Sequence, residues 1–273
     1  MFYPEAPADL ERDLDTMLNR VPSQEELRGL RAVVVPHAGY PYSGFTAAHA
    51  FALLRGLQYD CVIAVGPSHR EYFNGISIYP GEGYETPLGV VPVNDEVRSL
   101  LLAEGGAMME SDLGHRSEHC IEVQLPFLQR TLGGFSFVPV IMGDQKRGMC
   151  EQLASALAHI ARTRNVLLIA SSDLSHYHPY NEAVVLDERV IRTVEQSSWT
   201  TFIDKFEDES FEACGGGPIA SVLGAAACIG ADRPKVLHYS TSGDVTGDMT
   251  AVVGYLSAAI GTRPGQAEVA SPQ

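Results

Sequence analysis

The sequence predicts a single α/β domain with a mostly parallel central sheet flanked by helices. Short apolar runs typical of buried strands alternate with stretches of helical period through most of the chain. The 273 residues suit one large domain, and a composition of 45% hydrophobic and 19% charged residues allows a sizeable core. No obvious linker interrupts the alternation. We therefore expect one domain over residues 1–261 and, because residues 262–273 lack apolar periodicity, a disordered tail.

The first elements read as helix, strand, helix and strand. Leu10, Leu14 and Leu18 are four residues apart and predict a helix over residues 9–18. Residues 31–35 form an apolar run typical of a buried strand. The next helix is indicated by one apolar face of helical spacing, and a second strand by residues 60–65. This order predicts a right-handed parallel crossover between the two strands.

The middle of the chain is richer in turns. Residues 75–79 and 89–93 bracket a loop rich in Gly, Pro and Glu, and this pattern predicts a hairpin or a pair of edge strands. Asn94 is a suitable cap for a helix that ends near residue 102. Residues 105–118 read as a mixed loop.

The second half returns to the alternating pattern. Pro126 interrupts the helical spacing of residues 121–132, so we expect a kink or a restart there. Pro218 suits the first turn of a helix because its missing N–H costs nothing there. The remaining expected elements are strands at 135–142, 165–170, 236–239 and 251–256, and helices at 150–162, 180–194 and 220–229.

Composition excludes several classes of function. The net charge of −15 argues against nucleic acid or an anionic membrane as the main partner. No apolar run approaches the roughly 20 residues of a membrane span, and no signal peptide is visible at the N-terminus. The five cysteines are odd in number and include no CxxC pair, unlike a disulfide framework. These observations predict a cytoplasmic protein.

Two histidines directly follow buried strands. His37 comes after the run 32–35, and His69 comes after the run 61–65. Because α/β sheets collect ligands at the carboxyl ends of their strands, we expect both histidines at one site. His176 follows a third strand and belongs to the same edge. Imidazole is a common ligand of zinc, copper and iron, so the pattern predicts a metal site.

Cys214 is a candidate for the third ligand. It lies in a Gly-rich loop just before a predicted helix, where a thiolate is stabilised. Three protein ligands with open positions are typical of a reactive metal centre and not of a structural one. The Gly215-Gly216-Gly217 run lacks the GxxxxGK[ST] pattern of a phosphate loop and is better read as backbone that packs closely.

Other residues of this region allow two readings each. Asp173 either orients His176 as an acid/base partner or caps the next turn. His119 lies in a Glu118-His119-Cys120 run without HExxH spacing, so it is either a ligand or a residue supporting one. Tyr40 either lines a pocket or packs in the core.

Six motifs together resemble the Memo family, which in prokaryotes is labelled AmmeMemoRadiSam system protein B. The resemblance spans residues 31 to 260. The motifs are Pro-His-Ala-Gly-Tyr at 36–40, Gly-Pro-Ser-His at 66–69, Glu-His-Cys-Ile-Glu-Val-Gln-Leu-Pro-Phe at 118–127, Ser-Ser-Asp-Leu-Ser-His at 171–176, Ala-Cys-Gly-Gly-Gly-Pro-Ile at 213–219 and Gly-Asp-Met-Thr-Ala-Val-Val-Gly-Tyr at 247–255.

This resemblance implies a fold similar to the class III extradiol dioxygenases of the LigB type, which hold non-haem iron(II) with two histidines and a glutamate. It places His37 and His69 on the histidine ligands, Cys214 where those enzymes use the carboxylate, and His176 on the acid/base histidine. His119, with Glu118 and Tyr40, is expected at the pocket or behind the ligands. The resemblance also implies radical-SAM and AMMECR1-like proteins as partners.

Three functions follow from these observations. The first is a metal-dependent redox enzyme that uses iron(II), with copper or zinc as alternatives because a thiolate is a softer ligand than a carboxylate. Its pocket would take a small molecule or a peptide. The second is a binding or adaptor module that keeps the dioxygenase scaffold without its chemistry. The third is a zinc hydrolase, for which Glu118 or Glu122 would be the base.

Overall fold

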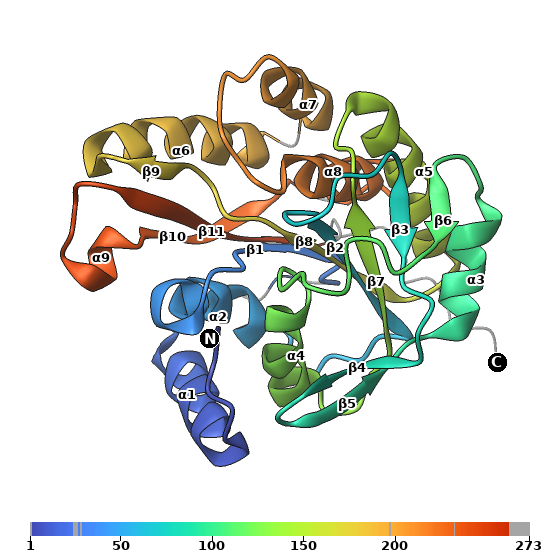
Figure 1. Ribbon diagram of the computed structural model, residues 1–273, viewed down its shortest axis with the longest axis horizontal. Coiled ribbons are helices and arrows are strands. Elements are labelled where there is room, and N and C mark those ends of the chain that lie inside the picture. Colours follow the sequence, from blue (N-terminus) through green and yellow to red (C-terminus); the bar gives the residue numbers. More distant parts are fainter. Residues whose placement is uncertain (1, 24–26, 28, 197, 232, 262–273) are drawn as a thin grey trace.

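A nine-stranded mixed sheet runs through the centre of the computed structural model, which describes residues 2–23, 27, 29–196, 198–231 and 233–261 (Figure 1). The expected tail at 262–273 and part of the loop near residue 24 lie outside the described residues. In spatial order the sheet contains β10 (Lys235–Thr241), β11 (Val252–Ile260), β1 (Ala32–Val35), β8 (Val166–Ser171), β2 (Cys61–Pro67), β7 (Phe137–Met142), β3 (Ile76–Ile78) and β6 (Met108–Glu110), with β9 (His176–His178) paired to β11.

The four central strands are parallel. β1 pairs with β8, β8 with β2, and β2 with β7, all in the same direction. β11 and β3 flank this group in antiparallel orientation. β1 and β2 are parallel, as the predicted crossover requires, but β8 lies between them. The predicted fold class, a single α/β domain with a mostly parallel central sheet, is confirmed.

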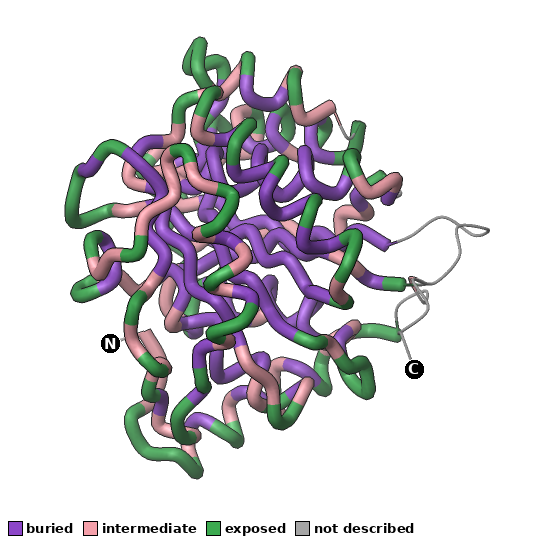
Figure 2. The backbone as a smooth tube through the Cα atoms, turned by 90° about the vertical axis from the view of Figure 1, so that its right-hand side faces the viewer, coloured by how far each residue is buried: buried purple, intermediate pink, exposed green. Residues whose placement is uncertain are grey.

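Helices cover both faces of the sheet, and this explains the continuous apolar runs (Figure 1). Successive β1 residues point to opposite sides, so Val33 packs in one core and Val34 in the other. Figure 2 shows that the residues along the central strands are buried. One face is covered by α1 (Pro7–Arg20), α2 (Phe45–Ala52) and α4 (Leu125–Leu132), and the other by α3 (Asp95–Ala103), α5 (Arg147–Thr163), α6 (Tyr180–Glu195), α7 (Trp199–Glu207) and α8 (Gly216–Cys228).

Local sequence signals explain where several helices begin. Asn94 caps α3, and its side chain accepts the Val97 N–H at 2.9 Å. Pro126 lies in the first turn of α4, after a short 3-10 turn at Glu122–Gln124, so the helix restarts as expected. A π-helical turn at Tyr40–Gly44 follows β1 and leads into α2.

The expected pairing of residues 75–79 with 89–93 is wrong. β3 instead joins the main sheet between β7 and β6. This position buries the side chains of Ile76 and Ile78 completely. The hairpin instead joins β4 (Gly83–Thr86), which lies inside the Gly- and Pro-rich stretch, to β5 (Gly89–Pro92), which is the expected strand at 89–93. Alternation in the sequence marked two strands but not which strand each one pairs with.

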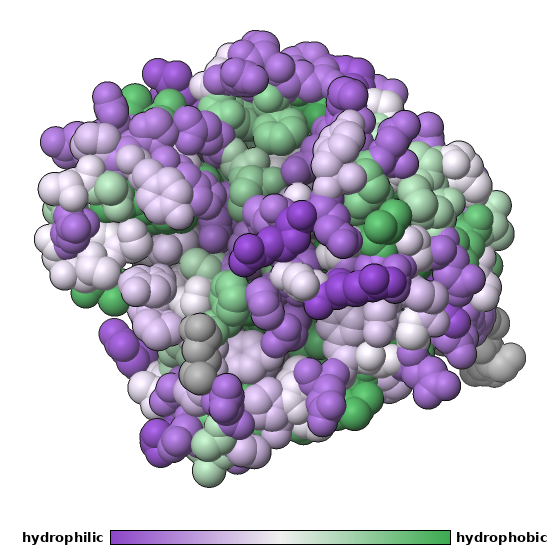
Figure 3. All heavy atoms as spheres, in the orientation of Figure 1, coloured by the Kyte–Doolittle hydropathy of each residue, from purple (hydrophilic) through white to green (hydrophobic). Residues whose placement is uncertain are grey.

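Four further short elements were not expected. β6 lies within the predicted mixed loop at 105–118, and the segments that contain β9, α7 and α9 (Gly243–Thr246) were given no element. Strands of three residues are too short to show a periodicity. None of the described helices is both long enough and apolar enough to span a lipid bilayer. The face seen in Figure 3 is mainly polar, with apolar side chains in separate patches.

Candidate metal centre

His37 and His69 meet above the carboxyl end of β8. Each lies two residues beyond its strand, β1 for His37 and β2 for His69. These strands are separated by β8, and therefore by about 10 Å at ordinary strand spacing. The two imidazole rings lean toward each other across this gap, with centroids 5.1 Å apart at 77°. The predicted meeting of the two histidines is found.

Cys214 approaches the same point from the loop between α7 and α8. Its Sγ lies 3.2 Å from His37 Nε2. One ligand atom from each of His37, His69 and Cys214 lies within 4.8 Å of the other two. The three predicted ligands, 177 residues apart in sequence at the extremes, are thus brought into one cluster.

A buried hydrogen-bond chain fixes the orientation of His37. Ser171 Oγ donates to the Cys120 carbonyl at 2.6 Å, so its only proton is used. His37 Nδ1, 2.9 Å from Ser171 Oγ, must then be the donor in that contact. The Gln124 amide also donates to Ser171 Oγ, at 3.0 Å. This chain selects the tautomer with a proton on Nδ1 and leaves the Nε2 lone pair toward Cys214.

Glu118 holds His69 from behind. Its carboxylate oxygens both lie 3.1 Å from His69 Nδ1, and it also accepts the backbone N–H groups of His69, His119 and Cys120. Burial works to raise the pKa of Glu118, but these hydrogen bonds outweigh it and lower the pKa to about 2. The hydrogen bond that His69 donates to the Glu118 carboxylate raises the pKa of His69. His69 Nε2 is left for the ligand cluster.

Close packing around three glycines positions Cys214. A Cβ on Gly215 would lie 2.3 Å from the Ser171 carbonyl, and one on Gly217 would lie 2.8 Å from the Gln145 side chain. Gln145 bonds both sides of this turn: its amide donates to the Cys214 carbonyl at 2.9 Å and its oxygen accepts the Gly217 N–H at 2.8 Å. The glycine run is therefore close-packed backbone, as expected. Burial, aided by Asp173, raises the pKa of the Cys214 thiol.

Asp173 contacts His37 and Cys214. Its Oδ1 accepts the His37 N–H at 2.8 Å, and its own N–H donates to Cys214 Sγ at 3.2 Å. Within the described residues, no hydrogen bond or ion pair joins Asp173 to His176, so the expected orienting contact is not found. His176, at the start of β9, is close enough that its positive form would lower the pKa of His37, which burial already lowers.

His119 and Tyr40 lie behind the N-terminal arm, residues 2–4. The Phe2 ring packs on His119 with centroids 4.5 Å apart, and the Tyr3 hydroxyl donates to Glu122. His119 Nδ1 is 3.0 Å from Glu122. Tyr40 is buried, donates its hydroxyl to the Val123 carbonyl at 2.7 Å and packs against the Tyr3 ring. Of the two readings of Tyr40, packing in the core is therefore the one that the structure shows.

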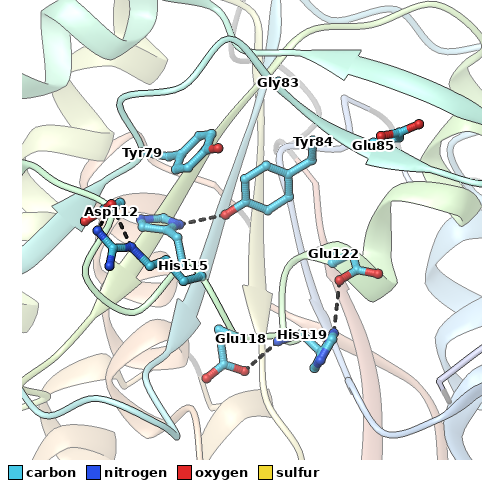
Figure 4. Close-up of a pocket in the computed structure, with 10 residues that line it drawn as sticks. Tyr79, Gly83, Tyr84, Glu85, Asp112, His115, Glu118, His119 and Glu122 are labelled. Atoms are coloured by element: carbon cyan, nitrogen blue, oxygen red, sulfur yellow. Dashed lines mark hydrogen bonds and ion pairs between the residues drawn. The ribbon is translucent and has the colours of Figure 1, made fainter.

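A cavity of about 330 Å³ adjoins the candidate metal centre at Glu118 (Figure 4). Tyr84 points its hydroxyl at His115, and Glu118 and His119 lie on the opposite side (Figure 4). The residues that line the cavity are Tyr79, Gly83, Tyr84, Glu85, Asp112, His115, Arg116, Glu118, His119 and Glu122.

Several supporting residues escaped the sequence analysis. Gln124, Gln145 and His115 were assigned no role, and Ser171 was considered only as part of a cap. Gln124 offered a signal, since it is a polar residue inside an apolar helical stretch and is almost fully buried. Nothing local marks Gln145, whose role arises from its meeting with a loop 69 residues away.

Comparisons with known proteins concern the family and the fold of the chain. The family model described as Memo-like protein matches residues 1–259. A MEMO1 family protein of Thermotoga neapolitana is 39% identical over 239 residues, 87% of this chain and 85% of the relative. One of Methanosarcina barkeri is 38% identical over 260 residues, 93% of this chain and 94% of the relative. The crystal structure of an uncharacterized protein of Escherichia coli K12 has a TM-score of 0.60 at 16% identity, covering 85% of this chain and all of that one, and so shares the fold.

Proposed function

Because this chain belongs to the Memo-like protein family, we propose that it binds a transition metal ion through His37, His69 and Cys214 and uses it in redox chemistry. One observation carries the proposal: the three ligand atoms lie within 4.8 Å of one another, while hydrogen bonds at Nδ1 hold both imidazole rings from behind. Metal bonds of about 2.0–2.3 Å close such a span with small side-chain shifts.

The donor set fits a borderline or soft metal ion. Two imidazoles and a thiolate suit iron, copper and zinc, and they suit magnesium or calcium poorly. We propose iron(II) as the native ion, with copper and zinc as competitors that the Cys214 thiolate favours. An ion on three protein ligands keeps open positions, at which a substrate and dioxygen can be activated.

The chain's own residues then perform three tasks. Ser171 and Glu118 keep the Nδ1 atoms of His37 and His69 protonated, so that Nε2 is the ligating atom of each ring. Asp173 holds the backbone of His37 and donates its N–H to the Cys214 sulfur. His176, at the start of β9, moves the substrate proton.

Hydrolysis on a zinc ion is less well supported. It needs a carboxylate that is free to accept a proton from water. Glu118 accepts four N–H groups, and Glu122 accepts from His119 and the Tyr3 hydroxyl. Glu118 is therefore fully engaged, and Glu122 already accepts two hydrogen bonds.

Metal analysis of anaerobically purified protein tests the site. Wild type should hold stoichiometric metal, and His37→Ala and Cys214→Ser should lose it. Two matched controls should keep it: His159→Ala on the exposed side of α5 and Cys228→Ser at the exposed end of α8. Unchanged metal content in both site variants would remove the proposed centre.

Turnover separates an enzyme from a binding module. A catechol or thiol substrate should be consumed by wild type and not by His176→Ala, with the same metal content in both. If metal-loaded wild type consumes neither class, the non-catalytic binding or adaptor function replaces the enzymatic one.

A further inference from the structure

The polar atoms around the cavity beside Glu118 mostly accept hydrogen bonds. His115 Nε2 lies 3.3 Å from the Ser77 carbonyl and must donate to it, so its Nδ1 accepts the Tyr84 hydroxyl proton at 2.7 Å. Burial lowers the pKa of His115 to about 4, which agrees with this neutral tautomer. The Tyr84 oxygen is therefore left with acceptor capacity only.

The charges around the cavity are mainly negative. Its lining contains four carboxylates, those of Glu85, Asp112, Glu118 and Glu122, and one Arg side chain. With the histidines neutral, the formal charge is −4 + 1 = −3. The Arg116 guanidinium is paired with Asp112, so it offers little to an incoming anion.

The carboxylates differ in how free they are. Glu118 already accepts four N–H groups and acts through its charge. Within the part of the chain that the structure describes, Glu122 accepts the His119 Nδ1–H and the Tyr3 hydroxyl, and a carboxylate has about four acceptor sites. Of these two side chains, Glu122 thus has the greater capacity to receive additional N–H donors.

Two tyrosine rings complete the wall. Tyr79 and Tyr84 pack edge to face, with centroids 4.9 Å apart at 83° (Figure 4). Aromatic faces attract organic cations, and they also pack well against the carbon atoms of such molecules. Acceptors, negative charge and aromatic walls together select a cation that donates hydrogen bonds.

We propose that the cavity binds the primary ammonium group of a small organic amine, with Glu122 as its direct partner and Tyr79 and Tyr84 around its carbon skeleton. The inference rests on the proposed function in one respect: the candidate metal centre gives the reason for binding an amine at this position. Glu118 lines the cavity and contacts His69, so an amine held here lies beside the candidate metal centre.

Titration calorimetry with benzylammonium tests the proposal on the full chain, with benzyl alcohol and benzoate as neutral and anionic probes of similar shape. Benzylammonium should bind at least about tenfold more tightly than either, and Glu122→Gln should weaken it by about tenfold, as expected for a charge-assisted hydrogen bond. Glu11→Gln, on the exposed side of α1, changes the net charge equally and should bind as wild type does.

Amide chemical shifts locate the bound probe, and residues 83–85 and 115–122 should be the ones that move. Equal affinity for benzoate, an unchanged affinity in Glu122→Gln, or an equal loss in Glu11→Gln would overturn the inference. Metal content is measured on the same samples. Amine binding without metal in wild type would reject the proposed function alone, whereas metal without amine binding would reject this inference alone.

Discussion

The Nδ1 atom of His69 lies 3.1 Å from each carboxylate oxygen of Glu118, and this pair joins the candidate metal centre to the neighbouring cavity. A carboxylate behind a histidine ligand orients the ring and strengthens its donor atom. The same carboxylate adds negative charge to the cavity wall. One side chain therefore influences both the metal and the ligand expected beside it.

Replacing Glu118 should weaken metal binding without removing a ligand. Glu118→Gln keeps the shape but loses the charge and part of the hydrogen bonding to His69, so metal affinity should fall about 10–100-fold. Competition with a chelator of known affinity measures the change. Glu85→Gln alters another cavity carboxylate and should leave metal affinity unchanged. Equal affinities in wild type and Glu118→Gln would show that the pair does not support the centre.

Ser171 should matter in the same way for His37. Ser171→Ala removes the acceptor that fixes the Nδ1 proton, so both tautomers become accessible and metal affinity should drop about tenfold. The matched control is Ser221→Ala, a buried serine in α8 that bonds the Gly217 carbonyl. If both variants bind metal as wild type does, the tautomer argument fails.

A single methyl group on Gly215 should disturb the Cys214 turn. Gly215→Ala places its Cβ against the Ser171 carbonyl, and overpacking of this kind costs about 1–3 kcal/mol of unfolding free energy. Metal affinity should fall with it, since Cys214 is the adjacent residue. In α5, Gly148 has open space at its Cβ position, so Gly148→Ala should be neutral or stabilising. Denaturant unfolding compares the two, and equal stabilities would contradict the packing account.

Acid should destabilise the fold through His115. Burial lowers the pKa of His115 to about 4 in the folded chain, so between about pH 6.5 and 4 the unfolded chain binds more protons. The contribution of His115 to the unfolding free energy is complete above pH 6.5. It falls by about 2–3 kcal/mol as the pH drops to 4.

The variant His115→Gln isolates that contribution. Gln can accept from the Tyr84 hydroxyl and donate to the Ser77 carbonyl, but it does not titrate. The unfolding free energy of His115→Gln should vary less between pH 6.5 and 4 than that of wild type. Identical slopes in the two proteins would assign the acid sensitivity elsewhere.

Local sequence patterns predicted the sheet and the ligand cluster for the same physical reason. Apolar runs mark buried strands, and the ends of parallel strands must share one edge, so His37 and His69 were expected together. Cys214 was found through its glycine-rich turn before a helix. These inferences need only the order of elements and the chemistry of single residues.

Pairing between distant segments could not be read in this way. The insertion of β8 between β1 and β2, the pairing of β3 with β7, and the support of Cys214 by Gln145 depend on tertiary packing. Asp173 is the clearest example. Its neighbours in sequence pointed to His176, but the backbone of His37 lies closer in space and takes its carboxylate.

The central claim is that His37, His69 and Cys214 hold one metal ion. A crystal of anaerobically purified protein, measured at the iron, copper and zinc absorption edges, tests it most directly. The account predicts a single anomalous peak within bonding distance of His37 Nε2, His69 Nε2 and Cys214 Sγ, strongest at the iron edge. A peak bound by other residues, or metal-loaded protein with no peak among these three atoms, would contradict it.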